Sequence, residues 1–130
     1  MNTQVMTVGS AKGDGDRRRP RIRLAGFWLD SMGFKPDSLV TADYADGSIV
    51  LRLQGEGLDA YRKIVGQVRT NRSGLLQVRN ELHNRKRTLH MEVKGFWLED
   101  MGFTIGSIIV VRSEYGLIRI NLIDTDKLGF

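Results

Sequence analysis

The stretch Gly26–Phe34 reads GFWLDSMGF, and the stretch Gly95–Phe103 reads GFWLEDMGF. When the sequence is shifted by 69 residues, Ile22–Leu53 aligns with Met91–Leu122 without a gap, and 11 of the 32 aligned columns are identical. An ungapped match of this quality between two parts of one chain does not arise by chance. We therefore infer that the chain contains a tandem duplication, and the repeated unit is the starting point for predicting the fold.

The first half of each repeat predicts a strand followed by a short helix. The letters RIRL in the first copy and HMEV in the second alternate polar and apolar residues, as a half-buried strand does. Trp28, Leu29 and Met32 then have the spacing of one apolar helical face, and the second copy repeats it. Gly33 follows at the position where a helix commonly ends in a left-handed residue.

The second half of each repeat predicts a β-hairpin. Val40, Ala42 and Tyr44 alternate with polar residues, and Asp46-Gly47 is a strong signal for a tight hairpin turn. A unit of this size cannot bury its own apolar face. Two such units packed around a pseudo-twofold axis can do so, in the manner of a homodimer fused into one chain. We expect an α+β fold that is mostly β.

The segment between the repeats predicts two helices rather than a simple loop. Apolar residues at helical spacing run from Leu58 to Val68 and again from Leu75 to Leu82. The predicted organisation is a disordered N-terminal arm at 1–16, the first repeat at 17–54, a basic helical linker at 55–87, the second repeat at 88–123 and a C-terminal tail at 124–130.

Composition narrows the class of protein. The chain has no cysteine, so disulfides, thiolate metal ligands and cysteine nucleophiles are excluded. No apolar run approaches the roughly 18 residues of a membrane span, and the N-terminus has no signal-peptide pattern. We expect a cytoplasmic protein that has no membrane contact and no cofactor. Within the cytoplasm, it could associate with the nucleoid.

The positive charge is concentrated in two segments. The net charge is +5, and Arg17–Arg23 alone carries five arginines. Residues 57–89 hold eight basic and two acidic residues. One such segment leads into each repeat, which suggests a polyanionic partner; the alternative is a solvated charge run that only aids solubility. The candidate nucleic-acid-binding residues are Arg17, Arg18, Arg19, Arg21, Arg23, Arg85, Lys86 and Arg87.

The order of a basic lead, RIRLAGFWLDSMGF, a turn and DGSIVLRL resembles the SymE-like toxin family, and GFWLEDMGFTIGS in the second copy is closer to the usual family form. The resemblance covers both repeats, about half of the chain. It implies a swapped-hairpin β-barrel of the AbrB type, with both copies of the unit in one chain here. It also implies a small bacterial growth-inhibiting toxin that acts on RNA or binds and compacts DNA, and we expect the chain to come from a bacterium or a phage.

Three functional hypotheses follow. The first is a DNA-binding protein that uses the arginine clusters on phosphates, with DNA preferred to RNA as the partner. The second is an RNA-cleaving toxin, an endoribonuclease for which His83 and His90 are the weak catalytic candidates. The third is a protein-interaction module or a phage-borne inhibitor of a host nucleic-acid machine, acting through the linker helices. The chain would be a monomer with an internal pseudo-dimer or a domain-swapped homodimer, and no metal site is expected.

Overall fold

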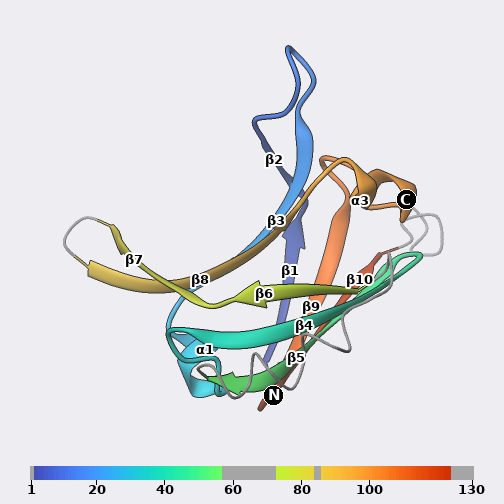
Figure 1. Cartoon of the computed structure of the whole chain (residues 1–130). Helices are drawn as coiled ribbons and strands as arrows, with labels where there is room; N and C mark the ends of the chain where they lie inside the picture. Colours follow the sequence, from blue (N-terminus) through green and yellow to red (C-terminus); the bar gives the residue numbers. More distant parts are fainter. Residues whose placement is uncertain (1, 57–72, 84–85, 124–130) are drawn as a thin grey trace.

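The computed structural model describes residues 2–56, 73–83 and 86–123. These residues form strands and two very short helices (Figure 1). Within them, no helix is long and apolar enough to cross a membrane. In chain order the elements are β1 (Asn2–Thr7), β2 (Gly9–Ala11), β3 (Arg19–Ala25), α1 (Trp28–Ser31), β4 (Ser38–Ala45), β5 (Ser48–Glu56), β6 (Ser73–Gln77), β7 (Arg79–His83), β8 (Lys86–Lys94), α3 (Trp97–Asp100), β9 (Ile108–Glu114) and β10 (Leu117–Leu122).

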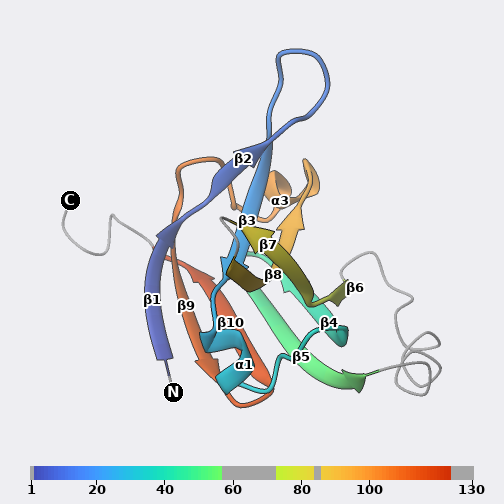
Figure 2. The same ribbon diagram turned by 90° about the vertical axis from the view of Figure 1, so that its left-hand side faces the viewer.

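The strands form two antiparallel sheets. Sheet A has six strands in the order β1-β9-β10-β5-β4-β6, and sheet B has four in the order β2-β3-β8-β7. Figures 1 and 2 show sheet B crossing over one side of sheet A. The predicted α+β class with mostly β structure is confirmed. The predicted swapped-hairpin β-barrel is not closed in the described residues, because the hydrogen bonds of these strands divide between two sheets that each keep two edges.

Two bent strands connect the edges of the sheets. β1 lies at the edge of sheet A and passes through Val8 into β2 at the edge of sheet B, and β6 passes through Val78 into β7 in the same way. The bend residues make equivalent backbone bonds. The Val8 N–H donates to Ser107 O at 2.9 Å, and the Val78 N–H donates to Ser38 O at 3.0 Å. Both valines are buried, so each bend is also part of the core.

The N-terminal arm was predicted to be disordered over residues 1–16, and this is wrong for the part that forms strands. β1 pairs with β9 from Asn2 opposite Ser113 to Thr7 opposite Ile108. β2 pairs with β3. The reason is tertiary, because β9 would otherwise leave its backbone groups unpaired along one side, and an added strand satisfies them.

The linker prediction also needs correction. The second predicted helix, from Leu75 to Leu82, is instead β6 and β7. β6 pairs with β4, and β7 pairs with β8, so the backbone of this segment is hydrogen-bonded to neighbouring strands. The local preference for a helix is weak, and pairing with neighbouring strands outweighs it in this segment. The first predicted helix, Leu58 to Val68, lies outside the described residues.

The strand order is unchanged when the two halves of the chain are exchanged. β1 to β5 correspond to β6 to β10 in order, and both sheets read the same after this substitution. In sheet B, Arg23 lies opposite Glu92, and in sheet A, Val50 lies opposite Arg119. Each pair joins equivalent columns of the sequence repeat. An axis that exchanges the halves therefore passes through both pairs, and the structural repeat extends beyond the sequence repeat to include β1, β2, β6 and β7.

The repeated nine-residue phrase forms a short helix with a glycine cap, as predicted. The Phe34 N–H donates to Leu29 O at 2.9 Å and the Gly33 N–H donates to Asp30 O at 3.0 Å, the two bonds of a Schellman cap. Gly33 has φ 90°. The second copy has the same arrangement around Gly102. The cap turns the last phenylalanine of each phrase, Phe34 or Phe103, into the core, where its side chain is fully buried.

Candidate nucleic-acid interface

The arginines of β3 alternate with core residues. Pro20, Ile22 and Leu24 are buried, while Arg19, Arg21 and Arg23 are half-buried on the other face of the strand. Successive residues of a strand point to opposite faces, so the three arginines share the outer face of sheet B. The Cα of Lys94 lies opposite that of Arg21, which places Lys94 on the same face. We call Arg19, Arg21, Arg23 and Lys94 the basic face.

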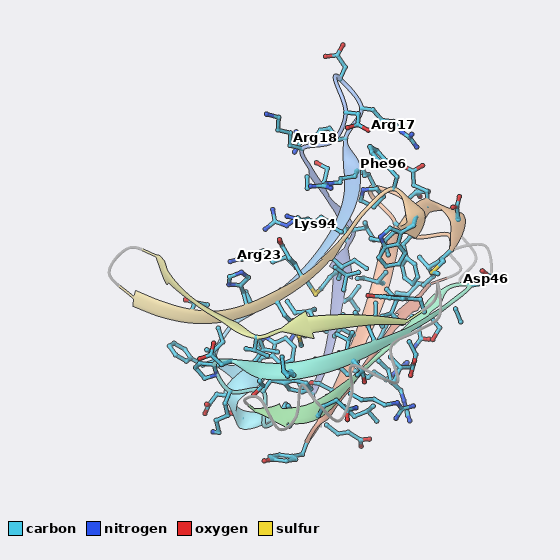
Figure 3. The ribbon with its side chains drawn as sticks, viewed as in Figure 1. Arg17, Arg18, Arg23, Asp46, Lys94 and Phe96 are labelled. Carbon is cyan, nitrogen blue, oxygen red and sulfur yellow. The ribbon has the colours of Figure 1, made fainter. Side chains whose placement is uncertain are left out.

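Arg17 and Arg18 do not belong to the basic face. The Arg17 Nη2 lies 2.9 Å from Glu99 Oε2, and its guanidinium lies 4.1 Å from the ring centre of Phe96. These contacts attach the turn between β2 and β3 to α3 (Figure 3). The Arg18 Nε donates to Ser10 Oγ at 2.9 Å, across the same hairpin. The five arginines therefore have different surroundings. Arg17 contacts α3, Arg18 bonds within the β2–β3 hairpin, and the remaining three lie on the basic face.

Glu92 lies within the basic face and links two of its cations. Its carboxylate is 2.8 Å from Arg21 Nε and 3.1 Å from Lys94 Nζ. Burial alone would raise the pKa of Glu92, but the hydrogen bond from Lys94 and the positive charge of Arg21 outweigh burial and lower it below its ordinary value. Glu92 is thus ionised at neutral pH, and it offsets one of the four positive charges of the basic face.

The charge on sheet B is asymmetric about the axis that exchanges the halves. Arg21 and Arg23 of the first repeat correspond to His90 and Glu92 of the second. Because Arg23 and Glu92 lie directly opposite one another, the change of charge occurs at the axis itself. Beside the axis, the first repeat therefore contributes two arginines to the outer face of sheet B where the second repeat contributes a histidine and a carboxylate.

A hollow of about 210 Å³ borders the basic face at the bend between β1 and β2. Figure 2 shows β1, which lies beside β9, continuing through this bend into β2, which lies beside β3. Its lining residues are Met6, Thr7, Gly9, Ser10, Arg21 and Arg23. Sequence reasoning identified only the two arginines in this set. The others were missed because the arm was expected to be disordered, and Lys94 was missed because the pairing of β3 with β8 has no local signal.

The second predicted cluster is only partly described. Arg85 lies outside the described residues. Lys86 and Arg87 begin β8, where their Cα atoms lie opposite those of His83 and Leu82. The structure therefore places the backbone of this cluster at the far end of sheet B from the turn that carries Arg17 (Figure 1).

The two histidines occupy separate positions in sheet B. The Cα of His83 lies opposite that of Lys86, whereas His90 lies opposite Arg79. These register positions are four residues apart along the strands, which is about 13 Å at 3.3 Å per residue. The backbone arrangement does not bring the two candidates together as an acid–base pair. In the described part of the chain, no group of three or more His, Asp or Glu residues is placed to hold a metal ion.

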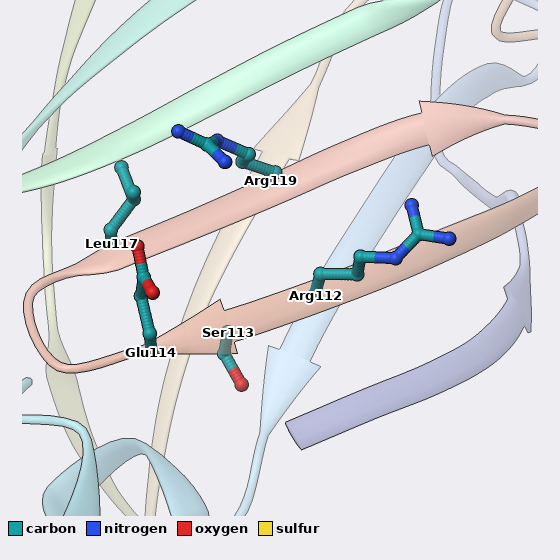
Figure 4. Close-up of a pocket in the computed structure, with 5 residues that line it drawn as sticks. All are labelled: Arg112, Ser113, Glu114, Leu117 and Arg119. Carbon is teal, nitrogen blue, oxygen red and sulfur yellow. The ribbon is translucent and has the colours of Figure 1, made fainter. Parts of the chain in front are cut away.

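A smaller hollow of about 60 Å³ lies on sheet A at the turn between β9 and β10 (Figure 4). It is lined by Arg112, Ser113, Glu114, Leu117 and Arg119. Arg112 and Arg119 are opposite one another in the register. Glu114 contributes a negative charge at the same hollow, so the charge there is mixed. The basic face of sheet B is a better candidate for a polyanion, because the hollow beside it has no acidic lining residue.

Comparison of the chain with protein-family models, with curated proteins and with solved structures returned no match.

Proposed function

We propose that this protein binds nucleic acid, with duplex DNA preferred to RNA, and that the basic face contacts the phosphate backbone. The observation that carries the proposal is the placement of Arg19, Arg21 and Arg23 on the side of β3 that faces away from the core, with Lys94 opposite Arg21. Alternate residues of a strand are about 6.7 Å apart. Adjacent arginines of this row can therefore reach neighbouring phosphates of one strand, and each contact releases condensed counterions.

The resemblance to SymE-like toxins and AbrB-type regulators supports the same function. The interleaved pairing is consistent with a swapped-hairpin arrangement, since the β4–β5 hairpin of the first half adds to β10 of the second. In this proposal both halves belong to one chain, and the molecule acts as an internal pseudo-dimer. The exchange of Arg21 and Arg23 for His90 and Glu92 beside the axis favours phosphate contact at β3 over the equivalent part of β8.

The first prediction tests the basic face with two triple variants of the full chain. One carries Arg19→Gln, Arg21→Gln and Arg23→Gln, and the other carries Arg52→Gln, Arg112→Gln and Arg119→Gln on sheet A. Both remove three positive charges. We expect the sheet B variant to lower the slope of log Kobs against log salt by about 2.7, at about 0.9 per duplex phosphate contact. We expect the sheet A variant to keep the wild-type slope.

Fluorescence anisotropy with labelled duplex DNA over a salt series measures this slope. Duplex RNA of the same sequence measures the preference for DNA. Equal losses in both triple variants would mean that only net charge matters, and would contradict an interface on sheet B. Absence of binding by the wild-type protein at low salt would contradict the proposed function altogether.

A further inference from the structure

The hollow beside the basic face has the size and the lining residues of an anion site. Its volume of about 210 Å³ is far above the roughly 10–15 Å³ that a cavity needs to hold one water. It lies where β1 bends into β2, so the two strands form one wall and β3 forms the other. Two of its lining residues are arginines and two carry hydroxyl groups.

Gly9 keeps the hollow open. Its Cα lies opposite that of Arg21, so a side chain at this position would stand on the outer face beside the arginine. The backbone of Gly9 is not left-handed, and a Cβ added there would lie 3.6 Å from Arg21 O, an ordinary contact. The conformation therefore does not require glycine here. What glycine provides is the absence of a side chain that would fill the hollow.

The lining groups are hydrogen-bond donors. The Nε of Arg21 lies 2.8 Å from Glu92 Oε2 in an ion pair. The two terminal nitrogens of the Arg21 guanidinium are further donors that can bond to a ligand. The hydroxyl of Ser10 accepts a bond from Arg18 Nε at 2.9 Å, and a hydroxyl that accepts can still donate its own proton. Guanidinium and hydroxyl donors around a space without an acidic lining residue are the groups that hold phosphate oxygens.

We propose that this hollow is a phosphate subsite that seats one phosphodiester group of the bound nucleic acid. The inference rests on the proposed function for its natural ligand. The phosphate held in the hollow fixes the position of the nucleic-acid backbone on the basic face. Thr7, Gly9 and Ser10 of the N-terminal strands thereby join the arginines of β3 in one site.

The second prediction compares Gly9→Val with Ala11→Val. Both add a β-branched side chain to β2 on the same face, since the Cα of Ala11 lies opposite that of Arg19, but only position 9 lines the hollow. NMR titration of the isotope-labelled full chain with inorganic phosphate should give saturable shifts at the amides of Gly9 and Ser10. We expect Gly9→Val to abolish the saturable shifts and Ala11→Val to retain them. Sodium chloride at matched ionic strength is the control for screening.

Duplex DNA supplies the second part of this test. We expect Gly9→Val to weaken DNA binding roughly tenfold and to lower the salt slope by about 0.9, the contribution of one phosphate, while Ala11→Val leaves both unchanged. Thermal unfolding of both variants checks that the fold is intact. Shifts that never saturate, or that chloride reproduces, would overturn the inference, as would wild-type DNA affinity in a folded Gly9→Val variant. Phosphate binding without DNA binding would uphold the anion site and contradict the proposed function.

Discussion

At the scale of single residues, Tyr44 shows how the two repeats share one core. Tyr44 belongs to the first repeat and is 8% exposed, and its ring centre lies 4.5 Å from that of Trp97 in the second repeat. The two rings meet edge to face, with their planes at 63°. The equivalent residue of the other copy is Ser113, which is also buried. The same position is therefore filled by an aromatic ring in one half and by a small hydroxyl side chain in the other.

The third prediction concerns the pH dependence of stability. Burial raises the pKa of Tyr44 to about 12, from an ordinary value of 10.0. The folded-state pKa is the higher one, so this contribution to stability is complete below about pH 10 and is lost as the pH rises toward 12. We expect the wild type to lose roughly 2–3 kcal/mol relative to Tyr44→Phe over this interval, at about 1.4 kcal/mol for each pH unit between the two values.

Urea unfolding of the wild type and Tyr44→Phe between pH 8 and pH 12 measures the difference. Tyr115→Phe is the control, because it removes the same hydroxyl group from a side chain that is 75% exposed. If the curves of the wild type and Tyr44→Phe were parallel, the phenol would not be held neutral by burial.

At the scale of elements, the two bends determine how the sheets are joined. Val8 and Val78 are 2% and 0% exposed, and each follows an edge strand of sheet A and precedes an edge strand of sheet B. The bonds to Ser107 O and Ser38 O hold the bends against the residue before β9 and the first residue of β4. Each bent strand is thus anchored by a buried side chain and a backbone hydrogen bond at the same residue.

The fourth prediction is that truncation of the bend valines destabilises the fold. Val8→Ala and Val78→Ala should each cost about 2 kcal/mol, because two buried methyl groups are lost and a small cavity remains. Val5→Ala is the matched control in β1, since Val5 is 68% exposed, and it should change stability by less than about 0.5 kcal/mol. Urea unfolding measures all three. A Val8→Ala cost no larger than that of Val5→Ala would show that this bend is not anchored by its side chain.

At the scale of the whole molecule, neither half of the chain forms a complete sheet. The central pair of sheet A is β5 with β10, and that of sheet B is β3 with β8, so each pair joins one strand from each half. β1 and β6 also pair with strands of the opposite half. Because every sheet depends on both halves, we expect the described fold to form and to unfold as a unit.

The fifth prediction tests this cooperativity with Phe34→Ala and Phe103→Ala. Both side chains are 0% exposed and occupy equivalent positions, so each change should cost about 3–5 kcal/mol. Each variant should unfold in a single transition that far-UV circular dichroism and tryptophan fluorescence report together. Trp97→Phe, made alone, leaves Trp28 as the tryptophan of the first half, and Trp28→Phe, made alone, leaves Trp97 as that of the second half. Transitions at different urea concentrations for the two reporters would contradict unfolding as a unit.

The sequence alone determined the features that depend on near neighbours. The duplication, the short helices, the glycine caps and the two hairpins β4–β5 and β9–β10 all follow from residues a few positions apart, because helical spacing, strand alternation and turn chemistry are local. The alternation in β3 likewise predicted a strand with Arg21 and Arg23 away from the core. These patterns identify the elements and the face that each one buries, but they do not show which strands are neighbours.

Only the tertiary structure decided the pairing of distant strands. The unpaired edges of β9 and β4 take up β1 and β6, which overrides the polar composition of the arm and the helical spacing after Leu75. The same pairing separates Arg17 from the basic face, adds Lys94 to it and forms the hollow beside Gly9. The physical reason is that backbone hydrogen bonds between strands are satisfied by any extended partner, so partner and register are selected by the packing of the whole chain.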